Sequence, residues 1–353
     1  MQTFKLFFLG FGTVGRALLR LLAEKQAFLR EMYEVSFPAA AVATRRHGMA
    51  LDPGGLAPAD LLRRSDAGGR IGKRDFDALH LKRLLAESEA DILIELTPTN
   101  RENGEPASTH ISAALDSRVH AVTANKGPVA FAYRTLRDQA RKNERRFLFE
   151  SAVMDGTPVF SLQREALPAA RILGFRGILN STTNYLLTRM AEGMDFEEAV
   201  SAAQAVGIAE TDPLADVDGW DAAFKVAALV NVWWGAALEP SAVKRRGIGK
   251  LAPDDIRRAR SEGRPYKLVC RAERTGRSVA ASVGPEQVEA DDPLAAVGGT
   301  GTMLILKTDV LPGVILGGSE PSPATTAYGL LSDLLCIARS GGVSLPRMSA
   351  PEK

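Results

Sequence analysis

The strongest constraint on the fold lies near the N-terminus, where a buried-strand pattern runs directly into a glycine loop and a helix. Lys5–Leu9 is nearly all apolar, and Arg16–Lys25 has the periodicity of an amphipathic helix. Between them, Gly10, Gly12 and Gly15 form the spacing G-x-G-x-x-G. The first glycine permits a tight turn, the second lets the backbone approach a pyrophosphate, and the third lets helix and strand pack closely. This context predicts a dinucleotide site, with a ligand-free glycine turn as the alternative.

Strands and helices keep alternating over roughly the first 150 residues. Such alternation predicts an α/β domain with a doubly wound parallel sheet, the Rossmann arrangement. We therefore expect a nucleotide-binding domain over residues 1–140, rejoined by a C-terminal helix at about 319–345. The expected strands are 39–43, 91–96 and 119–123, and the expected helices are 108–115, 133–142 and 324–338.

The pattern changes after about residue 140, which predicts a second, α+β domain with a mixed sheet over residues 141–318. Its strand candidates have strong helix candidates between them. The expected strands are 147–149, 171–179, 268–274, 279–283 and 303–308, and the expected helices are 185–192, 196–205 and 220–234.

Size and composition narrow the class of protein. The 353 residues exceed what one hydrophobic core normally holds, and 45% hydrophobic and 24% charged residues are ordinary for a globular protein. A formal net charge of +2 gives no basic surface for nucleic acid. We recognise neither a signal peptide nor an apolar run of membrane-spanning length, so we expect a cytoplasmic protein without membrane contact. Zinc is not expected, because the histidines lack helical ligand spacing: His47, His80, His110 and His120.

The end of the second strand bears on which dinucleotide binds. NAD-specific sites usually place an acid there for the ribose 2′-hydroxyl. This chain instead has Thr44, Arg45 and Arg46. Arginines suit a 2′-phosphate, so we expect NADP, with NAD still open. The alternative is that both arginines are solvated surface residues.

An acidic loop, defined here as Gly207–Lys225, is the richest cluster of functional groups. Five carboxylates belong to it, at Glu210, Asp212, Asp216, Asp218 and Asp221. Lys225 follows Asp221 by four residues, so the two share one helix face. The loop is either a solvated face or a site for a cationic polar ligand. For Asp212 and Asp218 we expect turn and helix-start roles, because they precede Pro213 and Gly219.

Several motifs, in this order, resemble those of the homoserine dehydrogenases. After the glycine loop come Asn125-Lys-Gly-Pro128, Glu150–Pro158 and Gly177–Tyr185, followed by the acidic loop. The resemblance spans about residues 4–338. It implies NAD(P)-dependent interconversion of L-homoserine and aspartate 4-semialdehyde, in the synthesis of threonine and methionine. It also implies a homodimer formed by the catalytic domain.

The resemblance assigns roles to particular residues. Lys126 and Lys225 are its two active-site lysines, with Asp221 beside them, and Lys225 is the leading candidate for proton transfer. The residues expected to bind substrate are Ser181, Thr182, Glu210, Asp216 and Asp221. Those expected to bind the dinucleotide are Gly10, Gly12, Thr13, Val14, Gly15, Arg45, Arg46, Thr97 and Lys126. A monovalent cation, sodium, is expected on carbonyls of Glu150, Val153, Asp155 and Thr157.

Some positions depart from the family pattern. The family often has glycine at Ser181 and tyrosine at Ile208, and Gly317–Pro323 replaces a loop richer in glycine. We also expect no C-terminal regulatory ACT domain.

Two other functions stay open. An aspartate-semialdehyde dehydrogenase would need a reactive thiolate, whereas Cys270 and Cys336 lie in apolar runs that predict buried free thiols. A non-catalytic dinucleotide sensor would keep the nucleotide site alone.

Overall fold

The computed structural model describes residues 1–209 and 212–341, and the chain divides into two compact units. The first unit comprises Met1–Pro128, Ala132–Gly156 and the segment from Ser322 onward. The second comprises Val129–Phe131 and Thr157–Pro321. The expected carboxylate at Glu210 lies outside the described residues. Among the residues described, no helix is both long and apolar enough to cross a membrane.

The first unit is built on a six-stranded sheet in the order β5-β4-β2-β6-β7-β8. The strands from β4 to β8 in this order are parallel, and β5 pairs antiparallel with β4 at one edge. The strands are β2 (Leu6–Leu9), β4 (Ala39–Thr44), β5 (Gly48–Leu51), β6 (Ile92–Glu95), β7 (His120–Thr123) and β8 (Phe147–Leu148), with β1 (Gln2–Thr3) and β3 (Val35–Ser36) forming a separate parallel pair. The helices are α1 (Thr13–Glu24), α2 (Gln26–Tyr33), α3 (Pro58–Asp66), η1 (Ala78–His80), α4 (Leu81–Glu87), α5 (Ala107–Asp116), α7 (Tyr133–Lys142), η2 (Glu150–Ala152) and α14 (Pro323–Ser340), while α6 (Lys126–Phe131) begins here and ends in the second unit.

Helices cover both faces of this sheet, as alternate residues of β2 show. Leu6 and Phe8 pack in one buried cluster with residues of α1, α2, α3 and α14. Phe7 and Leu9 pack in another with residues of α4 and α5. Because successive side chains of a strand point to opposite faces of the sheet, a strand that is apolar throughout must be covered on both faces. The doubly wound fold class expected from the sequence is confirmed.

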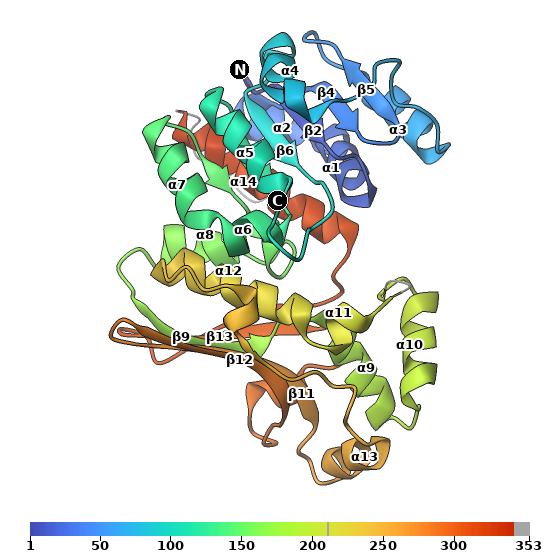
Figure 1. The fold of residues 1–353 in the computed structure, drawn as a ribbon, viewed down its shortest axis with the longest axis vertical. Helices are drawn as coiled ribbons and strands as arrows, with labels where there is room; N and C mark the ends of the chain where they lie inside the picture. The colour runs from blue at the N-terminus through green and yellow to red at the C-terminus, as the bar shows by residue number, and fades with distance from the viewer. Residues whose placement is uncertain (210–211, 342–353) are drawn as a thin grey trace, which may run out of the picture. The chain divides into compact units, whose positions relative to one another are not determined.

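The C-terminal helix α14 packs into the first unit although it follows the whole second unit in sequence (Figure 1). The Asp333 side chain, 1% exposed, accepts a hydrogen bond of 2.8 Å from the backbone N–H of Glu150. Gly329 permits close approach, since a Cβ there would lie 2.3 Å from Ser151 Oγ and 3.0 Å from the Asp155 carbonyl oxygen. These contacts tie α14 to the segment that follows β8.

The second unit has a mixed six-stranded sheet in the order β10-β12-β11-β9-β13-β14. All neighbours pair antiparallel except β10 and β12, which are parallel. The strands are β9 (Ile172–Ile178), β10 (Lys244–Arg245), β11 (Tyr266–Thr275), β12 (Ser278–Gln287), β13 (Thr302–Thr308) and β14 (Val314–Gly318). The helices are α8 (Val159–Ser161), η3 (Leu162–Ala166), α9 (Ser181–Ala191), α10 (Phe196–Ala205), α11 (Leu214–Val217), α12 (Trp220–Trp234), η4 (Pro240–Ala242), α13 (Pro253–Ser261) and η5 (Pro293–Ala296).

Two segments differ from expectation. The run at 147–149, expected in the second domain, pairs in parallel with β7 and so belongs to the first sheet. The segment Gly317–Pro323, expected to be a loop, begins as the end of β14, where Gly317 and Gly318 pair with Met303 and Thr302. In both cases long-range pairing decides the structure, and local sequence pattern does not record it.

Candidate functional site

The glycine loop after β2 has the geometry that close approach of a phosphate requires. Gly10 has φ +93°, and a Cβ there would lie 2.5 Å from the Leu96 carbonyl oxygen. A Cβ on Gly15 would lie 3.2 Å from the Gly10 carbonyl oxygen, which marks tight packing of helix on strand. A Cβ on Gly12 would meet no atom of the described structure within 4 Å, so this glycine borders open space there. The three glycines thus have the three separate roles that the fingerprint predicts.

The N-terminus of α1 is open to an anion. Gly12 is its N-cap residue, and no side chain of the described residues caps it. The first-turn N–H groups, including those of Thr13 and Val14, have no partners within the helix. A pyrophosphate suits this end, because N–H groups and the helix dipole both favour negative charge. The residues present therefore fit a dinucleotide.

A cavity of about 1040 Å³ lies beside this loop, at the carboxyl ends of β2, β4 and β6. This is where open α/β sheets bind their ligands. Among the residues that line it are Gly10, Gly12, Arg16, Arg45, Arg46, Asp77, Thr97, Asn100 and His110. The structure thus gathers glycines, arginines and Thr97 from distant parts of the sequence around one space large enough for part of a dinucleotide.

Arg45 and Arg46 are exposed residues in the hairpin between β4 and β5, and both line the cavity. Thr44 Oγ1 fixes this turn, accepting a 2.9 Å hydrogen bond from the His47 N–H and donating to the Gly48 carbonyl at 3.1 Å. Within the described parts of the chain, no carboxylate pairs with either guanidinium. Two cations at the rim of the cavity are arranged to meet an anionic group.

An acid that the sequence did not single out also lines the cavity. Asp77 accepts a 2.9 Å hydrogen bond from the Leu79 N–H and lies 2.8 Å from Nδ1 of His80. Its carboxylate thus already caps the N-terminus of η1. Nothing in its sequence context marks it, because it lies more than 30 residues beyond the end of β4.

The loop after β6 connects the cavity to Lys126. Asn125 Nδ2 donates to the Thr97 carbonyl at 3.0 Å, and Asn125 Oδ1 accepts from Thr99 Oγ1 at 2.9 Å. The same Oδ1 caps α6 by accepting from the Gly127 N–H at 2.9 Å. Lys126, the first residue of α6, is therefore fixed in the same network as the cavity wall.

A buried pair at the end of β6 was missed by the sequence reasoning. Glu95 is fully buried, and its Oε1 accepts hydrogen bonds from the backbone N–H and the hydroxyl of Thr97. Nδ1 of His110 lies 3.6 Å from Glu95 Oε1, and no hydrogen bond reaches it within the described structure. His110 also lines the cavity. The sequence feature that could have indicated this pair is a glutamate at the end of an apolar strand.

In the second unit, one asparagine draws together the described carboxylates of the acidic loop. Asn180 Nδ2 donates to Asp216 Oδ1 at 2.6 Å and to Asp221 Oδ2 at 2.9 Å. Its Oδ1 caps α9 by accepting from the Thr183 N–H at 2.8 Å. Lys225 Nζ lies 3.1 Å from Asp221 Oδ2 and donates to the Leu179 carbonyl at 2.7 Å.

This arrangement contains charges of both signs in a partly buried place. The side chains of Lys225 and Asp221 are 17% and 15% exposed, so the solvated-face interpretation does not apply to them. Ser181 and Thr182 open α9, where first-turn N–H groups lack partners within the helix. Carboxylates, an ammonium and helix N–H groups can together bind an amino acid.

The other two acids of the loop have local contacts. Asp212 Oδ1 accepts a 3.0 Å hydrogen bond from the Leu214 N–H, the turn role expected for it. Asp218 does not start α12: the N-cap is Gly219, at φ +77°, and no side chain caps it. Asp218 instead ends α11, and its backbone carbonyl accepts a hydrogen bond from Arg245.

The expected cation loop has unusual backbone geometry. Met154 and Asp155 are consecutive non-glycine residues with φ of +58° and +52°. Glu150, Val153 and Asp155 belong to the first unit and Thr157 to the second. The Thr157 carbonyl already accepts a 2.8 Å hydrogen bond from the Val159 N–H. Throughout 1–209 and 212–341, His, Cys, Asp and Glu side chains form no cluster suited to a metal ion, so any cation here would depend on carbonyls.

Cys270 does not have the surroundings of a nucleophile. Cys270 is fully buried, and burial raises the pKa of its thiol to about 12. Cys336 is half-buried on α14. A thiol that stays protonated does not attack an aldehyde, which argues against thioester chemistry at Cys270.

Comparisons with known proteins agree over most of the chain. Residues 10–150 match a family model described as "Homoserine dehydrogenase, NAD binding domain", and residues 158–335 match one described as "Homoserine dehydrogenase". The "NAD(+)-dependent homoserine dehydrogenase" of Pseudomonas canavaninivorans is 38% identical, over 96% of this chain and 97% of that protein. A homoserine dehydrogenase of Methanocaldococcus jannaschii is 37% identical, over 94% and 97%.

Solved structures give the same result. A putative homoserine dehydrogenase from Archaeoglobus fulgidus superposes with a TM-score of 0.84 at 30% identity, covering 95% of this chain and 99% of that one. A hyperthermophilic archaeal homoserine dehydrogenase in complex with NADPH superposes with a TM-score of 0.81 at 27% identity, covering 98% and 100%.

Proposed function

The chain belongs to the homoserine dehydrogenase family, and we infer that it interconverts L-homoserine and L-aspartate 4-semialdehyde by NAD(P)-dependent hydride transfer. It is an oxidoreductase that acts on the CH–OH group of homoserine. The observation that carries this function is the cluster of Asn180, Asp216, Asp221 and Lys225, which can bind an amino acid and move a proton. The reaction also requires a hydride acceptor, and the dinucleotide site in the same chain would hold it.

The chemistry needs a hydride acceptor and a base. When bound, oxidised nicotinamide accepts the hydride from the carbon that bears the homoserine hydroxyl. We assign the hydroxyl proton to Lys225, whose neutral amine takes it during oxidation and whose ammonium returns it to the aldehyde oxygen during reduction. Asp221, at 3.1 Å, stabilises the ammonium form. Lys126 is proposed as the second lysine, next to the reacting oxygen and the nicotinamide.

The substrate's own charges suggest the remaining roles. Its ammonium suits Asp216, Asp221 and Glu210, and its carboxylate suits the first-turn N–H groups of Ser181 and Thr182. Asn180 joins this set as a positioning residue, because its amide donates to both described carboxylates.

NADP is the proposed preferred cofactor. The support is the position of Arg45 and Arg46 at the cavity rim, without carboxylate partners in the described structure. The relative from Pseudomonas canavaninivorans is named for NAD(+), and the archaeal structure holds NADPH, so the family accommodates both. The two arginines support NADP for this chain.

Three further features are proposed. A monovalent cation, sodium, would be held by carbonyls of Glu150, Val153, Asp155 and Thr157, supported by the two left-handed residues in that loop. A homodimer would form through the mixed sheet of the second unit, supported by Ile315 on the edge strand β14, which is 54% exposed. A cytoplasmic location is supported by two free thiols.

Steady-state oxidation of homoserine with NADP and with NAD in parallel tests this function. We expect reduced cofactor to accumulate with homoserine, and no added phosphate to be required. Cys270→Ser and Cys336→Ser should keep this activity. Its loss in either variant would favour the thiol-dependent aspartate-semialdehyde dehydrogenase reaction, and cofactor binding without turnover would favour a sensor.

A further inference from the structure

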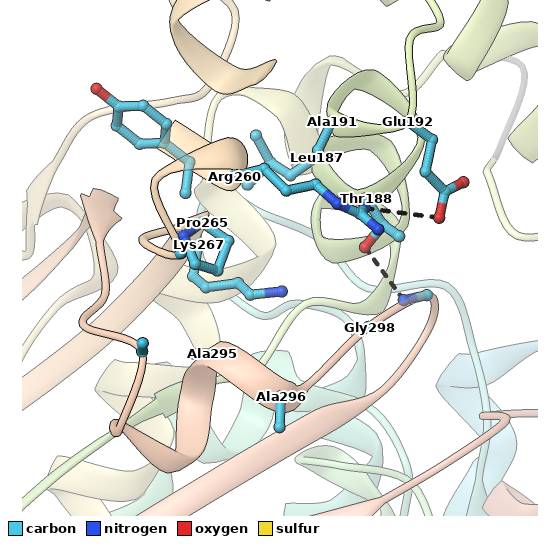
Figure 2. Close-up of a pocket in the computed structure, with 14 residues that line it drawn as sticks. Leu187, Thr188, Ala191, Glu192, Arg260, Pro265, Lys267, Ala295, Ala296 and Gly298 are labelled. Atoms are coloured by element: carbon cyan, nitrogen blue, oxygen red, sulfur yellow. Dashed lines mark hydrogen bonds and ion pairs between the residues drawn. The ribbon is translucent and has the colours of Figure 1, made fainter. Parts of the chain in front are cut away.

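A second cavity, of about 570 Å³, lies in the second unit between the end of α9, α13, the start of β11 and the loop after η5. Its walls are mostly apolar or glycine, with Leu187, Ala191, Pro265, Ala295 and Ala296 among them (Figure 2). Its titratable side chains are Glu192, Arg260, Tyr266 and Lys267. None of the residues in its lining has a role in the proposed reaction.

Lys267 is the unusual member of this lining. It is only 4% exposed, although lysines are almost never buried without a charged partner. Its Nζ donates to the Val297 carbonyl at 2.5 Å and to Asn184 Oδ1 at 3.3 Å, and no carboxylate pairs with it in the described structure. An ammonium has three N–H donors, and these contacts use two. Figure 2 shows the side chain extending into the cavity, toward the side occupied by α9.

A second cation faces the same space. Arg260, on α13, is about half exposed and lies 3.7 Å from Glu192 Oε1. Arg189 also pairs with Glu192, through Oε2 at 2.9 Å. Among the described residues, the single carboxylate of the lining is therefore shared by two arginines, and no anion pairs with Lys267.

Burial, and after it the positive charge of Arg260, lowers the pKa of Lys267 to about 8. Both cationic side chains line the same cavity, and the charge of Arg260 acts against the ammonium form of Lys267. An anion placed between them would relieve this repulsion and satisfy the third donor of Lys267. Because leucine, alanine and proline side chains also line the cavity, the ligand should carry a short apolar portion beside its charge.

We propose that this cavity is a binding site for a small carboxylate, whose charged end lies between Lys267 and Arg260 and whose short aliphatic part contacts Ala295 and Ala296. The site is separate from the proposed substrate-binding residues, and its occupation does not depend on the dehydrogenase reaction. A purely structural role for Lys267, holding the Val297 carbonyl, is the competing explanation.

Propionate is the probe for the test, with propylamine as its cationic counterpart of the same chain length. The full-length protein, labelled with ¹³C at alanine methyl groups, is titrated at neutral pH and followed by NMR. We expect propionate to shift the Ala295 and Ala296 methyl resonances in a saturable way, and propylamine to leave them unchanged. Unmoved Ala295 and Ala296 methyl resonances at high propionate would overturn the proposal.

Two arginines on α13 give a matched pair of variants. Arg260→Gln removes the exposed cation of the cavity and should weaken propionate binding by about tenfold or more, the effect of losing a charge-assisted contact. Arg258→Gln changes a 65% exposed arginine that pairs with Asp255 and does not line the cavity, so its affinity should match wild type. Equal propionate affinity in Arg260→Gln and Arg258→Gln would contradict the proposal and leave only the structural role of Lys267. Lys267→Met should abolish the shifts, provided that its spectrum is that of a folded protein.

Discussion

Lys225 Nζ lies 3.1 Å from Asp221 Oδ2, one turn further along α12, and both side chains are mostly buried. The spacing of four residues places them on one helix face. Asn180 ties Asp221 to Asp216, and the Leu179 carbonyl accepts from Lys225. The amine that we assign to proton transfer is therefore held from two sides before substrate arrives.

Removing this amine should remove most of the catalysis. In Lys225→Met the aliphatic stem remains but the hydroxyl proton has no acceptor, so we expect kcat to fall by about 100- to 10,000-fold. Lys250→Met, at an exposed position, is the control and should keep wild-type rates. The measurement is homoserine oxidation at saturating NADP. Activity within threefold of wild type in Lys225→Met would show that another group moves the proton.

Asn180 combines two roles that substitution can separate. Serine and aspartate can both cap α9 in its place, but neither can donate to Asp216 and Asp221 as an amide does. Asn180→Asp adds a third carboxylate where hydrogen bonds of 2.6 and 2.9 Å now lie. Repulsion between it and the carboxylates of Asp216 and Asp221 should push the three groups apart. We expect kcat/KM for homoserine to fall further in Asn180→Asp than in Asn180→Ser, by about tenfold.

Thermal unfolding provides the control for Asn180. Because serine keeps the cap without adding a charge, Asn180→Ser should lose far less stability than Asn180→Ala, which forfeits about 1 kcal/mol of capping. Equal kcat/KM in Asn180→Asp and Asn180→Ser would mean that the bridge to the carboxylates has no part in substrate binding.

The cofactor preference depends on the two rim arginines. Arg45→Ala/Arg46→Ala should lower kcat/KM for NADP by about 10- to 100-fold, since charge-assisted contacts to a 2′-phosphate are lost. The value for NAD should change little. Arg63→Ala is a suitable control, because this arginine is 75% exposed and pairs with Asp60 outside the cavity. Equal use of NADP and NAD by the wild type would contradict the argument from these arginines.

The sequence predicts the nucleotide-binding architecture well because its signals are local. The apolar run ending at Leu9, the three glycines and the periodic helix after them are contiguous, and each glycine has the packing expected of it. The i, i+4 relation of Asp221 and Lys225 is also local and is confirmed. Glu210 lies outside the described residues, so its role stays a prediction.

What the sequence does not predict depends on residues distant in the chain. The strand Phe147–Leu148 is two residues long, and nothing local tells which sheet it joins. The approach of His110 to Glu95 and the burial of Lys267 by Asn184 and Val297 arise only when separate elements pack. Asp218 was assigned to a helix start from the following glycine, but that glycine itself is the N-cap.

Lys267 should make the stability of the protein depend on pH in the alkaline range. Its pKa falls from 10.5, the ordinary value, to about 8 in the folded state. Between these values the unfolded chain binds a proton that the folded protein does not, so the free energy of unfolding rises with pH across this window. The difference corresponds to about 3 kcal/mol in total. Below pH 8 both states are protonated, and this residue gives no slope.

Denaturant unfolding of wild type and Lys267→Met at pH 7.5 and pH 9.5 measures this effect. Other titrating groups contribute equally to both proteins, so the difference in their slopes isolates Lys267. We expect the wild type to gain stability relative to Lys267→Met on going to the higher pH, by about 2 kcal/mol. Bound propionate should reduce this gain, because a carboxylate beside Lys267 favours its charged form in the folded state. Identical slopes in the two proteins would mean that the buried amine keeps its ordinary pKa.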